Sequence, residues 1–510
     1  MKKALSSMTI PAEAIALPTR GAVIDSAEWT KAPGIDGSEL TFYKVCGRIL
    51  SVDETAQNIG FRVNIPENWN GKVVQMGGAA YNGFVVSGET GDGAYGGLYC
   101  TPLEQNYATF GSDSGHTGDM WDPSFAENDE VFLNYAYVHI KKTKDAACEI
   151  IRDLTGKAPE KVYFFGASTG GREAMEAVEQ YPEDYDGVLA ACPGVTLICR
   201  AIHDSIVTDA QAANGGEGWI SLEQWQKVEK IVYDICDELD GVKDGLIGNI
   251  PAAEAKRGEI IEAVKAADIL TEKQLDALVL ACTTWKNDFP LAEGTTTLPS
   301  WSWLIGGAPY DMDYGPDMPV INYGSTPTAR DSSMARTAYT LLQWMCMRTH
   351  DFDRATFRFE EHPEEIRKGS EMVDAASVNY DKFLAKGGKI IMTQGTCDQF
   401  ITIYNVIEYY DRLVEAYGKE QLGEFFRLYV VPGMGHVGGG KFLAKTDYLE
   451  ALDKWVCDGQ APEKLTALDL FPQNGGRTRP IYPYPAFAVY NGTGDVNDEG
   501  SFHSSEEGEA

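Results

Sequence analysis

The chain has 510 residues and an ordinary globular composition, 44% hydrophobic and 23% charged, which excludes a disordered or fibrous protein. Its formal net charge of −33 repels nucleic-acid phosphates and anionic lipid headgroups, so we expect no nucleic-acid partner and no membrane partner. Polar residues after Met1-Lys2-Lys3 interrupt any apolar stretch of a signal peptide. We therefore expect a cytoplasmic protein. The ten cysteines form no CxxC pair, so neither a zinc ribbon nor a thioredoxin motif is indicated, and the composition favours reduced thiols.

The first 196 residues predict strands alternating with helices. Apolar residues alternate or run together where strands are expected, and they recur at helical spacing between those runs. Such alternation is typical of an α/β protein with a parallel sheet. The expected strands are residues 61–65, 72–76, 161–165 and 186–191, and the expected helices are 134–155 and 172–181.

The pattern changes between residues 197 and 385, where helical stretches dominate and the loops are rich in Gly, Pro, Trp and Tyr. The strand pattern resumes at 388–392 and 425–431. We therefore predict a sheet domain made of two parts, an inserted helical domain, and an acidic tail that is expected to be mobile. The boundaries are 1–196 and 386–490 for the sheet domain, 197–385 for the insertion and 491–510 for the tail.

Ser168 lies in the motif Gly166-x-Ser168-x-Gly170, between a predicted strand and a predicted helix. A nucleophile on such a sharp turn needs very small neighbours, and the following helix places backbone N–H groups near a developing oxyanion. The alternative is a Gly-rich turn with an incidental serine. The context favours a nucleophile in an α/β-hydrolase sheet that carries a large, mostly helical lid-domain insertion.

A serine needs a base and an acid that orients the base, and in this fold they follow it in the order Asp or Glu, then His. Asp398 comes just after the strand at 388–392, and His436 comes just after the strand at 425–431. Strand ends are where ligands meet an open α/β sheet. We therefore predict Ser168, Asp398 and His436 as a catalytic triad.

Two backbone N–H groups are needed for an oxyanion hole. Thr169 directly follows the nucleophile, and the small-residue loop Gly77-Gly78-Ala79-Ala80 follows the strand at 72–76. We predict Thr169 and Ala79 as the donors, with Gly78 as the alternative to Ala79.

Further short motifs lie at residues 69–71, 75–78, 111–116, 181–187, 239–245, 433–436 and 479–485. Together with Gly166-Ala-Ser-Thr-Gly-Gly-Arg172 they resemble the tannase/feruloyl esterase family, and the resemblance covers most of the chain. It implies a serine esterase that hydrolyses esters of aromatic acids beneath a lid domain. It also supports the three triad residues.

The family has a cysteine directly before the nucleophile and another directly after the histidine, joined as a disulfide. Here Ala167 and Val437 occupy these positions, so the triad must be held by packing alone. The missing cysteines agree with a reducing compartment.

The resemblance also implies a structural calcium in the inserted domain. The matching ligands are the side chains of Asp237, Asp240 and Asp244 and the carbonyl groups of Val242 and Leu246. Calcium prefers six to eight oxygen ligands, so the set is chemically sensible. The alternative is a solvated acidic helix end. The chemistry itself is expected to need no cofactor.

The predicted substrate is a small aromatic ester, for example of gallate or a hydroxycinnamate, cleaved through an acyl-enzyme. The alternatives are an α/β-hydrolase acting on a different ester or an amide, and a catalytically inactive scaffold. The sequence leaves the oligomeric state open. Aromatic residues of the insertion are candidates for contact with an aromatic acyl group, although each one is more simply explained as core: Trp301, Trp303, Tyr310, Tyr314 and Trp344.

Overall fold

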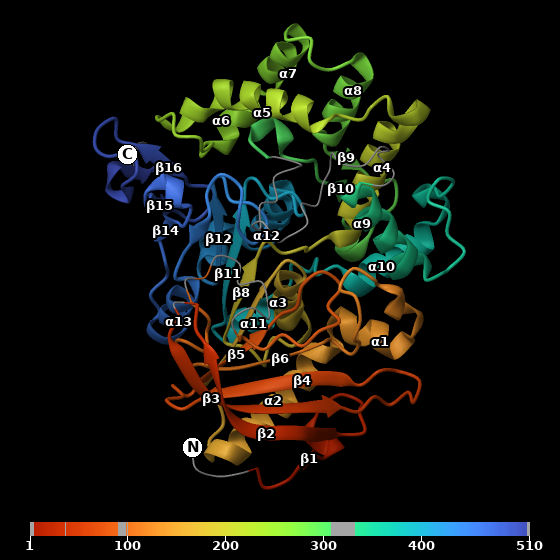
Figure 1. Ribbon diagram of the computed structural model, residues 1–510, viewed down its shortest axis with the longest axis vertical. Coiled ribbons are helices and arrows are strands. Elements are labelled where there is room, and N and C mark those ends of the chain that lie inside the picture. Colours follow the sequence, from red (N-terminus) through yellow and green to blue (C-terminus); the bar gives the residue numbers. More distant parts are fainter. Residues whose placement is uncertain (1–4, 36, 90–97, 99, 308–331, 507–510) are drawn as a thin grey trace.

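The structure is a computed structural model that describes residues 5–35, 37–89, 98, 100–307 and 332–506 (Figure 1). A ten-stranded sheet crosses the molecule in the order β1-β2-β3-β4-β6-β5-β7-β8-β11-β12. Strands β6, β5, β7, β8, β11 and β12 run parallel, and β1 to β4 are added to them in antiparallel fashion. The strands are β1 Thr9–Ile10, β2 Ala22–Pro33, β3 Glu39–Ile49, β4 Ile59–Pro66, β5 Lys72–Met76, β6 Ala108–Ser112, β7 Lys161–Ala167, β8 Gly187–Ala191, β11 Lys389–Gly395 and β12 Phe426–Val431.

Helices cover both faces of the parallel strands, as expected when parallel strands are connected by crossovers. One face packs against α3, α11 and α12, and the other packs against α13. The antiparallel strands form their own core with α2. The covering helices are α2 His139–Thr155, α3 Thr169–Gln180, α11 Asp381–Ala385, α12 Ile403–Gly423 and α13 Tyr448–Asp458, with α1 Asp129–Leu133 before α2.

The chain between β8 and β11 is mainly helical and has a core of its own around Trp225, Trp301 and Trp303. Helices α5 to α8 lie at the opposite end of the molecule from β1 to β4 (Figure 1). This part contains α4 Leu197–Gly216, α5 Leu222–Cys236, α6 Ile250–Ala255, α7 Arg257–Ala266, α8 Glu272–Ala281, α9 Ser333–Leu341 and α10 Pro363–Val373, with a short hairpin of β9 Trp285–Lys286 and β10 Thr297–Leu298.

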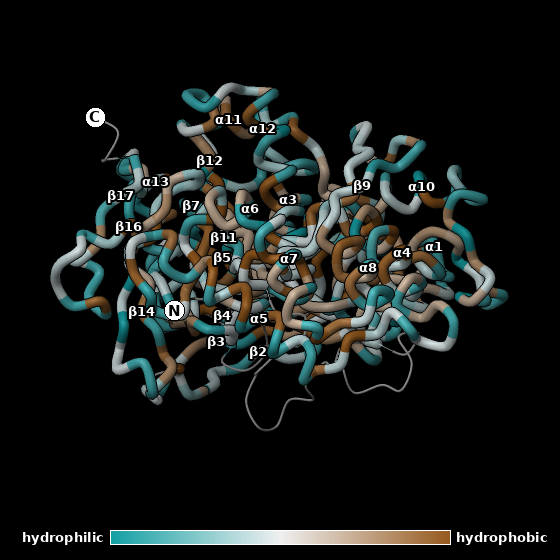
Figure 2. The backbone as a smooth tube through the Cα atoms, turned by 90° about the horizontal axis from the view of Figure 1, so that it is seen from above, coloured by the Kyte–Doolittle hydropathy of each residue, from teal (hydrophilic) through white to brown (hydrophobic). Residues whose placement is uncertain are grey.

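Hydrophobic residues gather along the central strands, and hydrophilic residues lie on the outer loops (Figure 2). The six parallel strands carry buried side chains almost throughout, which is why their sequences read as short apolar runs rather than alternating patterns. Among the described residues, every helix is too short or too polar to cross a bilayer.

The prediction of a mobile tail from residue 491 is wrong for the residues that the structure describes. Strand β16 (Ala488–Tyr490) pairs with β17 (Phe502–Ser504), and Arg479 stacks on the Phe502 ring at 4.2 Å. Acidic and small residues suggested disorder, but strand pairing and long-range contacts, including a hydrogen bond from the Thr478 N–H to the Asn497 carbonyl at 2.8 Å, hold the segment in place. Before it lie β13 Ala444–Lys445, β14 Leu465–Asp469 and β15 Thr478–Ile481, which form a three-stranded sheet.

The predicted strands and helices of the sheet domain are confirmed within a few residues. Two long strands, β2 and β3, were not predicted. In β2, exposed polar residues interrupt the apolar pattern. Residues 134–155 form two helical pieces, a π-helical turn at Asn134–Val138 and then α2.

Candidate active site

Ser168 lies on a sharp turn between β7 and α3. Its backbone has φ +62° and ψ −121°, a strained conformation for a residue with a side chain, and its N–H donates to the Ala191 carbonyl at 2.9 Å. A Cβ atom at Gly166 would come within 2.2 Å of the Gly170 carbonyl oxygen, and one at Gly170 would come within 2.7 Å of the Gly78 carbonyl oxygen. The glycines are therefore required by close backbone contacts, and the turn presents a half-buried serine side chain.

Asp398 and His436 form a buried pair, as predicted for the acid and base of a triad. His436 Nδ1 lies 2.9 Å from Asp398 Oδ2. The other carboxylate oxygen, Oδ1, accepts the N–H groups of Phe400 and Ile401, both at 2.8 Å. Because a carboxylate only accepts, Nδ1 carries a proton, and Nε2 is the nitrogen that can act as the base when the imidazole is neutral.

The pKa of His436 is shifted by two opposing effects. Burial disfavours the imidazolium, but the adjacent Asp398 carboxylate and the Cys192 thiol outweigh burial and raise the pKa to about 10. The protonated form of the imidazole is thus strongly stabilised, as a general base requires once it has taken a proton.

Adjacent parallel strands bring these residues to one edge of the sheet. Ser168 follows β7, Asp398 follows β11 and His436 follows β12. Strands β11 and β12 are adjacent, and β8 alone lies between β7 and β11. Carboxyl ends of parallel strands share an edge, which is where open α/β sheets place their ligands. The contact between Ser168 and His436 stays a prediction.

The predicted oxyanion loop packs directly against the serine turn. The Gly170 N–H donates to the Gly78 carbonyl at 3.1 Å, and the Thr169 hydroxyl donates to the Ala80 carbonyl. The Gly78 N–H is already bound, at 2.8 Å, to the buried carboxylate of Glu173. Within the described part of the chain, the N–H groups of Thr169 and Ala79 donate to no protein acceptor, which favours Ala79 over Gly78 as the second donor.

Glu173 was not predicted as a residue of the site, because a single Glu in a helix gives no sequence signal of its role. Its side chain is 1% exposed, and its two oxygens bind the Gly78 N–H and the Asn82 side-chain amide at 2.8 and 2.7 Å. One carboxylate on α3 therefore fixes the loop that carries Ala79.

Cys192 is a second residue of the site that sequence reasoning missed. It follows β8 with φ +37°, and it is fully buried. Its Sγ, a ring nitrogen of His436 and a carboxylate oxygen of Asp398 all lie within 4.8 Å of one another. All ten cysteines are free thiols, and Ala167 and Val437 take part in one apolar cluster at the positions where the family resemblance implies a disulfide.

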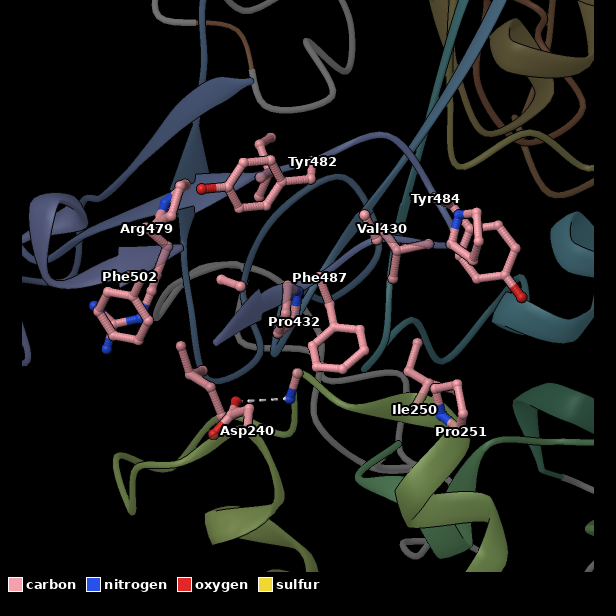
Figure 3. Close-up of a pocket in the computed structure, with 17 residues that line it drawn as sticks. Asp240, Ile250, Pro251, Val430, Pro432, Arg479, Tyr482, Tyr484, Phe487 and Phe502 are labelled. Atoms are coloured by element: carbon pink, nitrogen blue, oxygen red, sulfur yellow. Dashed lines mark hydrogen bonds between the residues drawn. The ribbon is translucent and has the colours of Figure 1, made fainter. Parts of the chain in front are cut away.

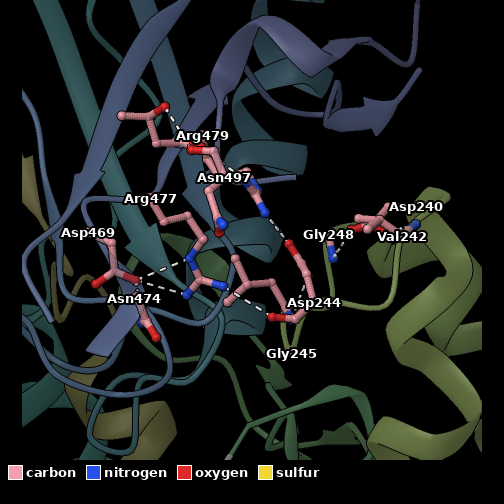
Figure 4. Close-up of polar contacts among 12 residues, drawn as sticks. Asp240, Val242, Asp244, Gly245, Gly248, Asp469, Asn474, Arg477, Arg479 and Asn497 are labelled. Carbon is pink, nitrogen blue, oxygen red and sulfur yellow. Dashed lines mark hydrogen bonds and ion pairs between the residues drawn. The ribbon is translucent and has the colours of Figure 1, made fainter. Parts of the chain in front are cut away.

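The predicted calcium ligands lie on a turn after α5, beside the C-terminal segment (Figure 4). The pKa of Asp240 is raised to about 7, because burial disfavours its charged form and the neighbouring Asp244 carboxylate repels it. Asp244 is neutralised by a buried ion pair with Arg479, and Arg477 donates to the Asp244 carbonyl at 3.1 Å.

These donors fit Ca²⁺ in kind, since they are all hard oxygen ligands. They do not form a closed coordination sphere. Among the described residues, the group of three His, Cys, Asp or Glu side chains whose ligand atoms lie within 4.8 Å of one another is Cys192, Asp398 and His436, away from this loop. For the loop to close around an ion, the Asp244 carboxylate would have to leave Arg479 and bind the cation instead.

A cavity between this loop and the C-terminal segment does not include the candidate triad (Figure 3). It is lined by proline, aromatic and aliphatic residues, with Asp240 and Arg479 as its charged members. Of the aromatic residues considered for acyl contact, Trp301, Trp303 and Trp344 are buried in cores, whereas Tyr310 and Tyr314 lie outside the described residues.

Comparisons with known proteins agree with this architecture. The family model for tannase and feruloyl esterase matches residues 43–505. The chain is 34% identical to an uncharacterised esterase of Agrobacterium fabrum, over 98% of this chain and 92% of the relative. It is 27% identical to the mono(2-hydroxyethyl) terephthalate hydrolase of Piscinibacter sakaiensis, over 95% of this chain and 89% of that enzyme. Feruloyl esterase B of Aspergillus oryzae superposes with a TM-score of 0.77 at 20% identity, over 97% of this chain and 99% of that chain.

The protein is thus a carboxylic ester hydrolase with the predicted α/β-hydrolase fold. It belongs to the tannase and feruloyl esterase family, which confirms the resemblance recognised in its sequence.

Proposed function

We propose that the protein hydrolyses carboxylic esters of aromatic acids, such as gallate or hydroxycinnamate esters, by a serine mechanism with an acyl-enzyme. The observation that carries this proposal is the buried Asp398–His436 pair at the same sheet edge as the strained Ser168 turn. Relatives named as feruloyl esterases and a terephthalate ester hydrolase support an aromatic acid.

In the proposed first step, His436 Nε2 takes the Ser168 hydroxyl proton while the oxygen attacks the ester carbonyl. The charge that develops on the carbonyl oxygen is stabilised by the N–H groups of Thr169 and Ala79, each worth about 3 kcal/mol in comparable sites. Asp398 holds the Nδ1 proton and stabilises the imidazolium. His436 then returns its proton to the departing alcohol.

In the second step, His436 activates a water molecule that hydrolyses the acyl-enzyme and restores Ser168. The apolar contacts of Ala167 and Val437 hold the two turns in the same cluster that includes Cys192. We expect these packing contacts to replace the positional role of a disulfide.

A calcium ion at the 237–246 loop is a separate structural proposal. The carboxylates of Asp237, Asp240 and Asp244 would hold it together with the carbonyl groups of Val242 and Leu246, and oxygen coordination there would relieve carboxylate repulsion. The ion would tie the loop together and take no part in ester cleavage.

The activity is tested with methyl gallate, methyl ferulate and chlorogenate, using wild type and Ser168→Ala. We expect hydrolysis of at least one ester, reduced at least 10³-fold in the variant at an unchanged melting temperature. Undiminished hydrolysis by a folded Ser168→Ala variant would contradict the serine mechanism. Cleavage of amides but not of these esters would contradict the proposed substrate class.

A further inference from the structure

An exposed tryptophan lies two ring contacts from the histidine of the site. Trp121, in the loop between β6 and α1, is 49% exposed. Its ring stacks on Phe400, with centroids 6.3 Å apart and planes inclined by 24°. Phe400 in turn meets the His436 ring edge-on at 5.0 Å. Aromatic surface therefore extends from the solvent to the imidazole.

Both rings come from segments that are attached to the catalytic groups. The residue before Trp121, Met120, accepts the N–H of Tyr81, which follows the oxyanion loop, at 2.9 Å. On the other side, the Phe400 N–H donates to Asp398 at 2.8 Å. These hydrogen bonds fix the segment of Trp121 relative to the oxyanion loop, and the segment of Phe400 relative to the acid that orients His436.

The side of the substrate that meets these rings follows from the mechanism. In triad chemistry the imidazole gives its proton to the leaving group, so the alcohol departs on the imidazole side. Phe400 covers that imidazole, and Trp121 extends the aromatic surface outward.

We propose that Trp121 and Phe400 form a binding surface for an aromatic ring on the alcohol part of the ester. This makes Trp121 a specificity-determining residue for esters of aryl alcohols, in addition to whatever acid is accepted. The inference rests on the proposed serine esterase function.

The charge around this surface selects further among alcohols. The exposed residues Asp119 and Asp122 flank Trp121, and the Asp119 carboxylate accepts the backbone N–H of Trp121 at 3.0 Å. Carboxylates at this rim, on a chain of net charge −33, disfavour an anionic alcohol. The preferred leaving group is therefore an uncharged aromatic alcohol.

The test compares Trp121→Ala and Trp121→Phe with Trp29→Ala as the matched control. Trp29 is 46% exposed and also contacts an aromatic ring, Tyr43, but it lies on β2, an outer strand of the sheet (Figure 1). The substrates are benzyl acetate, cyclohexylmethyl acetate, 4-carboxybenzyl acetate and methyl benzoate. They separate an aromatic alcohol from a bulky aliphatic alcohol, a charged one and an aromatic acid.

We expect Trp121→Ala to raise KM for benzyl acetate about five- to tenfold, with kcat within twofold, because a stacked ring is lost. In Trp121→Ala, KM for cyclohexylmethyl acetate and for methyl benzoate should change less than twofold. Trp121→Phe keeps an aromatic ring, so its KM for benzyl acetate should stay close to that of wild type. Trp29→Ala should behave as wild type with every ester. For wild type, 4-carboxybenzyl acetate should have a higher KM than benzyl acetate.

An unchanged KM for benzyl acetate, or an equal loss with methyl benzoate, would overturn the inference and leave the esterase proposal intact. An equal KM for the charged and uncharged benzyl esters would overturn the proposed charge selection. If wild type hydrolysed none of the four esters or the phenolic esters above, the proposed function itself would fail.

Discussion

At the scale of residues, the site depends on groups that close contacts with their neighbours hold in one position. Ser168 has a strained backbone between glycines, and the two oxygens of Glu173 hold the loop that carries Ala79. The motif around Ser168 could be predicted from sequence because close backbone contacts demand specific small residues. Glu173 could not, because its partners Gly78 and Asn82 are distant in the chain.

Glu173→Gln tests whether the carboxylate positions the oxyanion loop. Glutamine keeps the size but has only one acceptor oxygen, so either the Gly78 N–H or the Asn82 amide loses its partner. We expect kcat to fall about tenfold, which corresponds to about 1.4 kcal/mol, with KM within twofold. Glu223→Gln, at an exposed position of α5, is the control. A normal kcat in a folded Glu173→Gln variant would show that the contact has no catalytic role.

The pH dependence tests the state of His436. Only the neutral imidazole can accept the serine proton. Burial lowers the pKa of His436, but the charge of Asp398 more than offsets burial, and the pKa is raised to about 10. We therefore expect kcat/KM to rise with pH from 7 towards 10. In Asp398→Asn the rising limb should move to lower pH, and the rate should fall roughly 10⁴-fold. A wild-type plateau already reached at pH 7 would contradict a raised pKa.

At the scale of elements, the order of adjacent strands explains why distant residues meet. Strands β7, β8, β11 and β12 are neighbours although the helical insertion separates β8 from β11 in sequence. Apolar runs predict these strands because both faces are buried. Cys192 shows the limit of such reasoning, since its proximity to His436 depends on β8 and β12 lying on either side of β11 and ending at the same edge of the sheet.

The loop after α5 gives a prediction of the same scale. Adding Ca²⁺ to protein treated with a chelator should raise Tm by a few degrees, because an ion that binds only the folded state stabilises it. Asp240→Asn should remove most of this increase, and Mg²⁺ should not replace Ca²⁺. Equal Tm values with calcium and with chelator would contradict the calcium proposal.

At the scale of the whole molecule, composition and pattern predicted the α/β-hydrolase sheet and the position of the helical segment, but not the antiparallel extension or the ordered C-terminal hairpin. Within the extension, β2 has many exposed residues, so its sequence lacks the apolar signal of a buried strand. The hairpin is acidic and Gly-rich, yet Phe502 packs beneath Arg479. Its order depends on long-range contacts such as this one and the hydrogen bond from the Thr466 hydroxyl to Glu499, which local composition does not reveal.

The most direct measurement of the central claim is covalent labelling with a fluorophosphonate followed by mass spectrometry. Fluorophosphonates react with a serine only when a nearby base activates it. We predict one adduct, on Ser168, formed in parallel with loss of ester hydrolysis and absent from Ser168→Ala and His436→Ala. Complete loss of hydrolysis with the adduct on another residue, or continued hydrolysis by protein fully labelled at Ser168, would contradict the proposed nucleophile.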